Sequence, residues 1–234
     1  MLRVIAFALI ASAALPLGAL AGIRAPMSRS TVAMMLGFAS GALISAVAFE
    51  LFDEAYHHGG VGWASASFLA GATAFVLIDN WLERRIRDRA RAGAGIGFAL
   101  LAAVTLDGVP ENLAMGVSLI EYGSVALLVA IFVSNFPEAA AGAKKMKDAG
   151  FSDRHTMLIW IGAAVLLAAA VLVGYLALDG ASGRTLSVPL AFAAGAVLAS
   201  LADTIMPEAF EEGGTKVAYA TALGFLLSYV LAVG

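Results

Sequence analysis

Residues 41–60 read GALISAVAFELFDEAYHHGG, and residues 195–214 read GAVLASLADTIMPEAFEEGG. Seven of these twenty aligned positions are identical without a gap, including the Glu-Ala pairs at 54–55 and 208–209 and the closing Gly-Gly. The match predicts an internal structural repeat that contributes one helix from each copy. Chance similarity between two helices rich in glycine and alanine is the alternative.

The composition around this repeat is that of a membrane protein. Of the 234 residues, 61% are hydrophobic and 13% are charged, whereas soluble domains average about 45–50% apolar and 25% charged residues. The length leaves no room for a soluble catalytic domain beside the apolar segments. Cysteine is absent, which excludes a disulfide framework, thiolate metal ligands and thiol catalysis.

Hydropathy predicts an all-α, polytopic membrane protein with eight transmembrane helices in a single domain, residues 1–234. A spanning helix takes about 20 apolar residues, and no stretch alternates as a barrel strand does. The first stretch also resembles a cleaved signal peptide, but the repeat needs it to complete a three-helix unit. We place the spans at residues 2–22, 31–53, 60–82, 95–119, 123–143, 156–178, 187–210 and 215–233.

The basic residues predict the orientation of the spans. The segments that follow odd-numbered spans hold 12 of the 14 Lys and Arg residues, and the positive-inside rule puts both termini outside. We expect a location in the plasma membrane, or in the inner membrane of a Gram-negative cell. Spans 2 and 7 then run in opposite directions, so that spans 1–3 and 6–8 form inverted repeats around spans 4 and 5. The 12 residues are Arg24, Arg29, Arg84, Arg85, Arg87, Arg89, Arg91, Lys144, Lys145, Lys147, Arg154 and Lys216.

Acidic residues inside the predicted spans indicate where function resides. An ionised carboxylate at the middle of a bilayer costs about 2.5–3.5 kcal/mol. The central parts of the predicted spans contain no Lys, Arg or His, so a salt bridge cannot offset this cost. Protons or bound metal ions remain as the neutralising partners. The acidic residues are Glu50, Asp107, Glu111, Glu138 and Asp203.

Spans 4 and 5 concentrate this signal. The first contains Leu-Asp-Gly-Val-Pro-Glu-Asn at 106–112, and the second contains Val-Ser-Asn-Phe-Pro-Glu at 133–138. Asp107 and Glu111 lie on one face of a helix, and so do Asn135 and Glu138. Each proline frees a backbone carbonyl in the preceding turn, although a proline by itself can mark a mere kink. If the two helices face each other, their oxygen atoms form a cage suited to a divalent cation.

In these motifs the chain resembles the ZIP (Zrt/Irt-like) family of divalent metal transporters. That family carries a His-Asn-x-Pro-Glu-Gly signature in its fourth span and a polar-x-x-Pro-Glu signature in its fifth. Pro110 and Glu111 match the first signature, and Asn135, Pro137 and Glu138 match the second. The resemblance implies eight spans in a 3+2+3 arrangement, a homodimer in the lipid bilayer, and passage of Zn²⁺ or a similar ion toward the cytoplasm.

The resemblance also implies a set of site residues, with departures from the family pattern. Asp107 stands where the signature has His, and Gly108 stands where it has Asn. Losing the nitrogen ligand weakens the case for Zn²⁺, so that Mn²⁺, Fe²⁺ or Cd²⁺ fits an oxygen site as well. The expected metal ligands are Asp107, Glu111, Asn112, Asn135 and Glu138, with Glu50 and Asp203 lining the route.

We therefore expect a transporter that works by alternating access around a site at mid-membrane. We expect no enzymatic activity, no organic cofactor and no nucleic-acid partner. An intramembrane hydrolase is disfavoured because the chain has neither His-Glu-x-x-His nor Gly-x-Ser-x-Gly. Two alternatives stay open: a ZIP-like protein that binds metal without transporting it, as a sensor or a degenerate member, and a proton-coupled carrier of a small solute.

Polar residues at the ends of the spans suggest further roles. His57 and His58 follow span 2, where they form either a metal-capturing mouth on the outside or a solvated polar turn. An acidic group at the cytoplasmic end of span 7 either attracts leaving cations or is a plain helix-end cluster. Asp79 is expected at the membrane interface. The acidic group is Glu208, Glu211 and Glu212.

Overall fold

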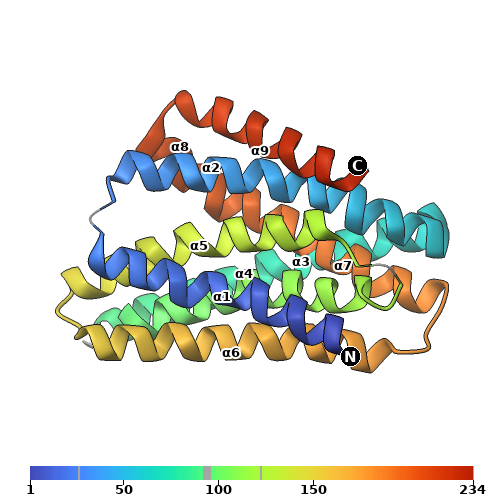
Figure 1. The fold of residues 1–234 in the computed structure, drawn as a ribbon, viewed down its shortest axis with the longest axis horizontal. Coiled ribbons are helices and arrows are strands. Elements are labelled where there is room, and N and C mark those ends of the chain that lie inside the picture. Colours follow the sequence, from blue (N-terminus) through green and yellow to red (C-terminus); the bar gives the residue numbers. More distant parts are fainter. Residues whose placement is uncertain (26, 92–95, 122, 234) are drawn as a thin grey trace.

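The computed structural model describes the chain except for residues 26, 92–95, 122 and 234, and it describes no side chains for residues 86–91 and 96–100. The described part is a bundle of helices joined by short turns, with no strand in it (Figure 1). The all-α prediction is confirmed for these residues. The helices are α1 (Leu2–Arg24), α2 (Arg29–Ala46), η1 (Val47–Phe52), α3 (Asp53–Arg91), α4 (Ile96–Ser118), α5 (Val125–Asp148), α6 (Asp153–Leu178), α7 (Arg184–Ser200), η2 (Leu201–Ile205), α8 (Met206–Gly213) and α9 (Lys216–Val233).

Six helical stretches of the described chain are long and apolar enough to cross a membrane. One of them, Arg29–Arg85, covers two of the predicted spans, and Gly60 interrupts it with a non-helical φ of 74° and ψ of 169°. Helix α4 matches the predicted span at 95–119 but is not one of the six. The count of eight spans therefore stays a prediction. The other five stretches are Leu2–Arg24, Val125–Asp148, Asp153–Leu178, Arg184–Gly213 and Lys216–Val233.

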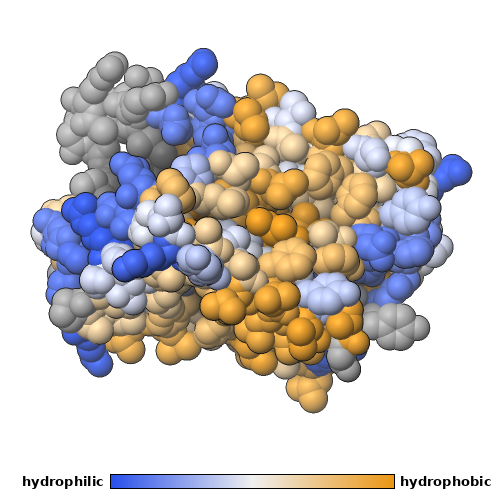
Figure 2. Space-filling model, turned by 90° about the horizontal axis from the view of Figure 1, so that it is seen from above, coloured by the Kyte–Doolittle hydropathy of each residue, from blue (hydrophilic) through white to orange (hydrophobic). Residues whose placement is uncertain are grey.

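Large apolar side chains cover the outer surface of the bundle. Figure 2 shows hydrophobic residues gathered across the middle of one face, with hydrophilic residues toward its two sides. A contiguous apolar surface of this kind is unfavourable in water and favourable against lipid tails. This distribution supports a membrane-embedded protein. Exposed apolar residues on α6 and α9 include Leu158, Val165, Val173, Leu223 and Val230.

The two ends of the bundle differ in charge. Both chain termini lie at the same end (Figure 1), which we call the terminal end. The opposite end, which we call the basic end, holds the end of α1 with Arg24, the start of α2 with Arg29, and the last turn of α5 with Lys145 and Lys147. Arg87, Arg89 and Arg91 belong to the predicted basic group but lie outside the residues whose side chains are described.

The two copies of the repeated sequence have the same backbone conformations. In the first copy α2 passes into the π-helix η1, and in the second copy α7 passes into the π-helix η2. The glycines that close the two copies, Gly60 and Gly214, have positive φ angles of 74° and 62°. Because π-helical turns are rare and frequently lie at functional sites, their recurrence at aligned positions makes chance similarity a poor explanation of the sequence match.

Close helix packing holds the two copies in place. Helix α2 packs on α9 and α7 packs on α3, while α1 packs on α5 and α6 packs on α4. A Cβ atom at Gly41 would lie 1.8 Å from the carbonyl oxygen of Thr221, and one at Gly195 would lie 1.9 Å from that of Phe68. Small residues permit such close approach between membrane helices. The two glycines are aligned in the repeat, so each copy uses the same packing device.

Replacing Gly195 by Ala is expected to destabilise the protein by about 1–3 kcal/mol, because the added methyl group meets backbone rather than a movable side chain. Gly162→Ala is the control, since a Cβ there meets no atom within 4 Å and Ala favours helix over Gly by about 1 kcal/mol. Thermal unfolding in detergent measures both variants. An unfolding midpoint of Gly195→Ala at or above that of the wild type contradicts the close packing.

Candidate metal site

The central helices α4 and α5 bring polar side chains into the core. Glu111, Asn112 and Asn135 are all buried, and Glu111 is only 4% exposed. Both helices continue through their prolines, Pro110 and Pro137. Because proline has no N–H, the carbonyl four residues earlier in each helix lacks its usual donor. The core therefore offers backbone oxygens as well as side-chain oxygens.

Three acidic residues of α4 and α5 lie within electrostatic reach of one another, and we call them the central cluster: Asp107, Glu111 and Glu138. The carboxyl of Glu111 is within electrostatic reach of Glu138 and of Asp107, and Glu138 is within reach of Asp107. The hydroxyl of Ser200 donates to Asp107 Oδ1 at 2.7 Å, and that of Ser134 donates to Glu138 Oε1 at 3.1 Å. These serines fix two of the three carboxylates without neutralising them.

The two predicted amide ligands are buried, and each has one polar atom without a partner. Asn112 Nδ2 donates to the carbonyl of Gly108 at 2.8 Å, which leaves Asn112 Oδ1 without a hydrogen bond among the described residues. Asn135 Nδ2 also lacks a partner there. Leaving a buried polar atom unsatisfied costs about 1–3 kcal/mol. A cation bound by Asn112 Oδ1, or by the Asn135 oxygen after an amide flip, would satisfy these groups.

A cavity leads from the central cluster to the basic end. Its volume is about 90 Å³, and its lining includes Asp107, Glu138, Lys145 and Glu208; it has room for roughly three water molecules. It adjoins a larger cavity of about 240 Å³, because Lys145 and Glu208 line both. Glu111, also a described residue, is not part of the lining. Asp107 and Glu138 are therefore the acids of the cluster that an ion from the basic end meets first.

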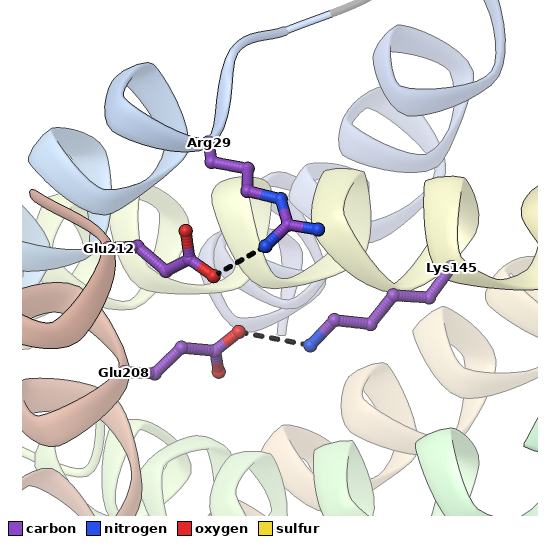
Figure 3. A network of polar contacts seen from close by, with 4 residues as sticks. All are labelled: Arg29, Lys145, Glu208 and Glu212. Carbon is purple, nitrogen blue, oxygen red and sulfur yellow. Dashed lines mark hydrogen bonds and ion pairs between the residues drawn. The ribbon is translucent and has the colours of Figure 1, made fainter.

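Figure 3 shows two ion pairs, and all four of their residues line the larger cavity at the basic end. Lys145 of α5 binds Glu208 of α8 at 3.0 Å, and Arg29 of α2 binds Glu212 of α8 at 3.1 Å. Two of the three acids that the sequence suggested as a cation-attracting exit are thus paired with bases. Such solvent-exposed pairs contribute about 0–1 kcal/mol, so these contacts can rearrange at little cost.

Asp203 has a partner that the sequence analysis missed. It lies in η2, and its carboxyl lies within electrostatic reach of that of Asp79 on α3. Asp203 and Asp79 both lie within electrostatic reach of Asp107. Asp79 thus belongs to the acidic network beside the central cluster and not merely to the membrane interface.

Glu50 lies away from the central cluster. Together with Glu54, Ser118 and Glu121 it lines a separate cavity of about 220 Å³ toward the terminal end. Eleven residues of α4 separate Ser118 from Asp107, a rise of about 16 Å. The described residues that line the two cavities do not overlap, and Met115, which follows Glu111 on α4, is fully buried. Of these two cavities, only the one at the basic end reaches the central cluster.

No protein-family model matches this sequence, and no curated protein sequence matches it. The role of the central cluster has to be inferred from its own residues and their geometry.

Glu111→Gln separates metal binding from folding, because glutamine has the shape of glutamate without its charge. We expect the variant to unfold in detergent at the temperature of the wild type or higher, since it no longer buries an ionisable group. We expect Zn²⁺ or Mn²⁺ to raise the unfolding midpoint of the wild type, because a ligand at 100 times its Kd stabilises by about 2.7 kcal/mol. The same metal should raise the unfolding midpoint of Glu111→Gln by much less.

Asp179→Asn is the matched control for this experiment, because Asp179 is an exposed acid at the end of α6. It should respond to metal as the wild type does. Equal metal-induced shifts in the wild type and Glu111→Gln would remove Glu111 from the site.

Proposed function

We propose that this protein is a ZIP-like transporter, which carries a divalent cation across the membrane through the central cluster by alternating access. The observation that carries the proposal is that Asp107, Glu111 and Glu138 lie within electrostatic reach of one another inside an apolar helical bundle. The transported ion is Zn²⁺, Mn²⁺, Fe²⁺ or Cd²⁺. In this proposal the metal is the substrate, and the protein needs no organic cofactor and catalyses no reaction.

Charge balance favours a cation as the substrate. Each ionised carboxylate at mid-membrane costs about 2.5–3.5 kcal/mol, and mutual repulsion among three adds to that cost. A divalent ion neutralises two of them and is held by the oxygen ligands that such ions accept. Among the described residues that line the cavity, the one base is Lys145, and it is paired with Glu208. An anionic substrate would find no free positive charge there.

The proposal includes eight spans, with inverted repeats of spans 1–3 and 6–8 around α4 and α5. Its support is the break at Gly60, which divides Arg29–Arg85 into two segments, and helix α4 with its 23 residues. The matching π-helices η1 and η2 support the repeat. By the positive-inside rule the basic end faces the cytoplasm and both termini lie outside. The homodimer implied by the family resemblance remains a prediction.

The reach of the two cavities supports alternating access. The cavity at the basic end reaches Asp107 and Glu138, whereas the cavity at the terminal end stops short of them. We interpret this as the conformation that is open to the cytoplasm. In the opposite conformation the cavity at the basic end would close and the cavity lined by Glu50 would extend to the central cluster. The weak ion pairs of α8 with α2 and α5 allow that exchange.

Flux through proteoliposomes tests this function. We expect wild-type protein to take up Zn²⁺ or Mn²⁺ into vesicles loaded with a metal-sensitive dye. Glu138→Gln should reduce the initial rate at least about tenfold, because losing a metal ligand costs no less than losing a ligand's hydrogen-bonding partner, which costs about 10–100-fold. Asp179→Asn should transport as the wild type does. Metal binding without flux in the wild type would support a sensor instead, and full flux in Glu138→Gln would remove the central cluster from the pathway.

Asp107→His tests whether the ligand set decides which ion is carried. The substitution places an imidazole nitrogen where the family signature has histidine. Nitrogen ligands favour Zn²⁺ over Mn²⁺, so we expect the Zn²⁺-to-Mn²⁺ ratio of uptake rates to rise. Asp107→Asn is the control, because it removes the charge without adding nitrogen basicity. Identical ratios in the two variants would show that position 107 does not contact the ion.

A further inference from the structure

A second group of metal-ligating side chains lies at the terminal end, away from the central cluster. Glu54, His58 and Glu121 each place one ligand atom within 4.8 Å of the other two. His58 Nε2 lies 3.3 Å from Glu121 Oε1 and 3.9 Å from Glu54 Oε1. Ligand atoms around a tetrahedral Zn²⁺ with bonds of 2.0–2.1 Å are separated by about 3.4 Å. Small side-chain rotations would bring the three atoms onto one ion.

Two separate parts of the chain build this group. Glu54 and His58 are four residues apart in α3 and therefore share one helical face. Glu121 comes from the connection between α4 and α5. In the topology deduced from the sequence, the segments after spans 2 and 4 lie at the same end of the bundle, which is where the structure brings them together. The sequence analysis noted His58 but missed Glu121, its partner.

The neighbouring pair Asp53 and His57 shows that the geometry is not general to this helix. Like Glu54 and His58, this pair places a carboxylate and an imidazole four residues apart, and His57 Nε2 lies 3.5 Å from Asp53 Oδ2. However, the side chain of His57 is 71% exposed, whereas that of His58 is 17% exposed and meets a second acid. Of the two pairs, only Glu54 and His58 are enclosed against another part of the chain.

The surroundings of Glu54, His58 and Glu121 favour a cation. Glu54 and Glu121 line the terminal-end cavity of about 220 Å³ together with Glu50, and both Glu50 and Glu121 act electrostatically on Glu54. Arg3 approaches the rim, where its guanidinium donates to the carbonyl of Gly123 at 3.3 Å, but it does not line the cavity. Water has room in this cavity to complete the coordination of an ion.

We propose that Glu54, His58 and Glu121 form a second divalent-cation site, separate from the central cluster, that selects Zn²⁺ over Mn²⁺. The selectivity follows from the imidazole nitrogen, which suits Zn²⁺ better than the all-oxygen ligands of the central cluster do. Binding at this site is independent of transport. Its role as the position where the carried ion first binds rests on the proposed function.

The test measures Zn²⁺ and Mn²⁺ binding to the purified full-length protein by isothermal titration calorimetry. The starting variant, Glu111→Gln with Glu138→Gln, removes two of the three carboxylates of the central cluster and leaves the second site intact. We expect it to bind one Zn²⁺, and to bind Mn²⁺ more weakly. Adding His58→Asn or Glu121→Gln should weaken Zn²⁺ binding by at least about tenfold, whereas adding His57→Asn should leave it unchanged.

Circular dichroism confirms that each variant keeps its helices. Zn²⁺ binding that His58→Asn does not weaken, or that His57→Asn weakens equally, overturns the proposal, and so does the absence of Zn²⁺ binding in the folded starting variant. If the protein shows no flux but binds Zn²⁺ in a way that depends on His58, the second site is supported and the proposed transport function is contradicted. The two inferences are therefore tested separately.

Discussion

The cost of burying carboxylates in an apolar bundle is the constraint on which the rest of the structure depends. Asp107, Glu111 and Glu138 lie within electrostatic reach of one another, in a protein whose outer surface is largely apolar. Hydrogen bonds from Ser134 and Ser200 hold two of these carboxylates but supply no charge. Such a cluster is stable only with protons or a cation, and exchange between the two would let the site both load and release an ion.

In the structure, a cavity reaches the cluster from the basic end, and a second cavity lies toward the terminal end without reaching it. The cavity at the basic end reaches Asp107 and Glu138, and that at the terminal end stops at Glu50, Ser118 and Glu121. The two π-helices lie at aligned positions of the repeat, on segments adjoining opposite cavities, since Glu50 belongs to η1 and Thr204 of η2 lines the cavity at the basic end. A pair of irregular segments beside opposite openings supports the proposed exchange between two access states.

The sequence allowed the helical class, most helix positions and the acids of the central cluster to be predicted, because a 20-residue apolar run and a four-residue spacing are local properties. It could not reveal the electrostatic interaction of Asp79 with Asp203, the Lys145–Glu208 pair or the contact of His58 with Glu121, since each joins residues distant in the chain. Continuation of the helix past Asp53 to His58 was also missed. A polar run that ends a span resembles a turn, and only packing against the α4–α5 connection distinguishes the enclosed histidine from its exposed neighbour.

Anomalous X-ray scattering from crystals grown with Mn²⁺ or Zn²⁺ tests the central claim most directly, because it locates the ion without reference to flux. The account predicts a peak at the central cluster, within coordination distance of carboxylate oxygens from both Glu111 and Glu138. A Zn²⁺-specific peak near His58 would be additional and would not replace it. Crystals in which the metal-bound protein shows no central peak, or in which Glu111 and Glu138 turn their carboxylates away from each other, would contradict the account.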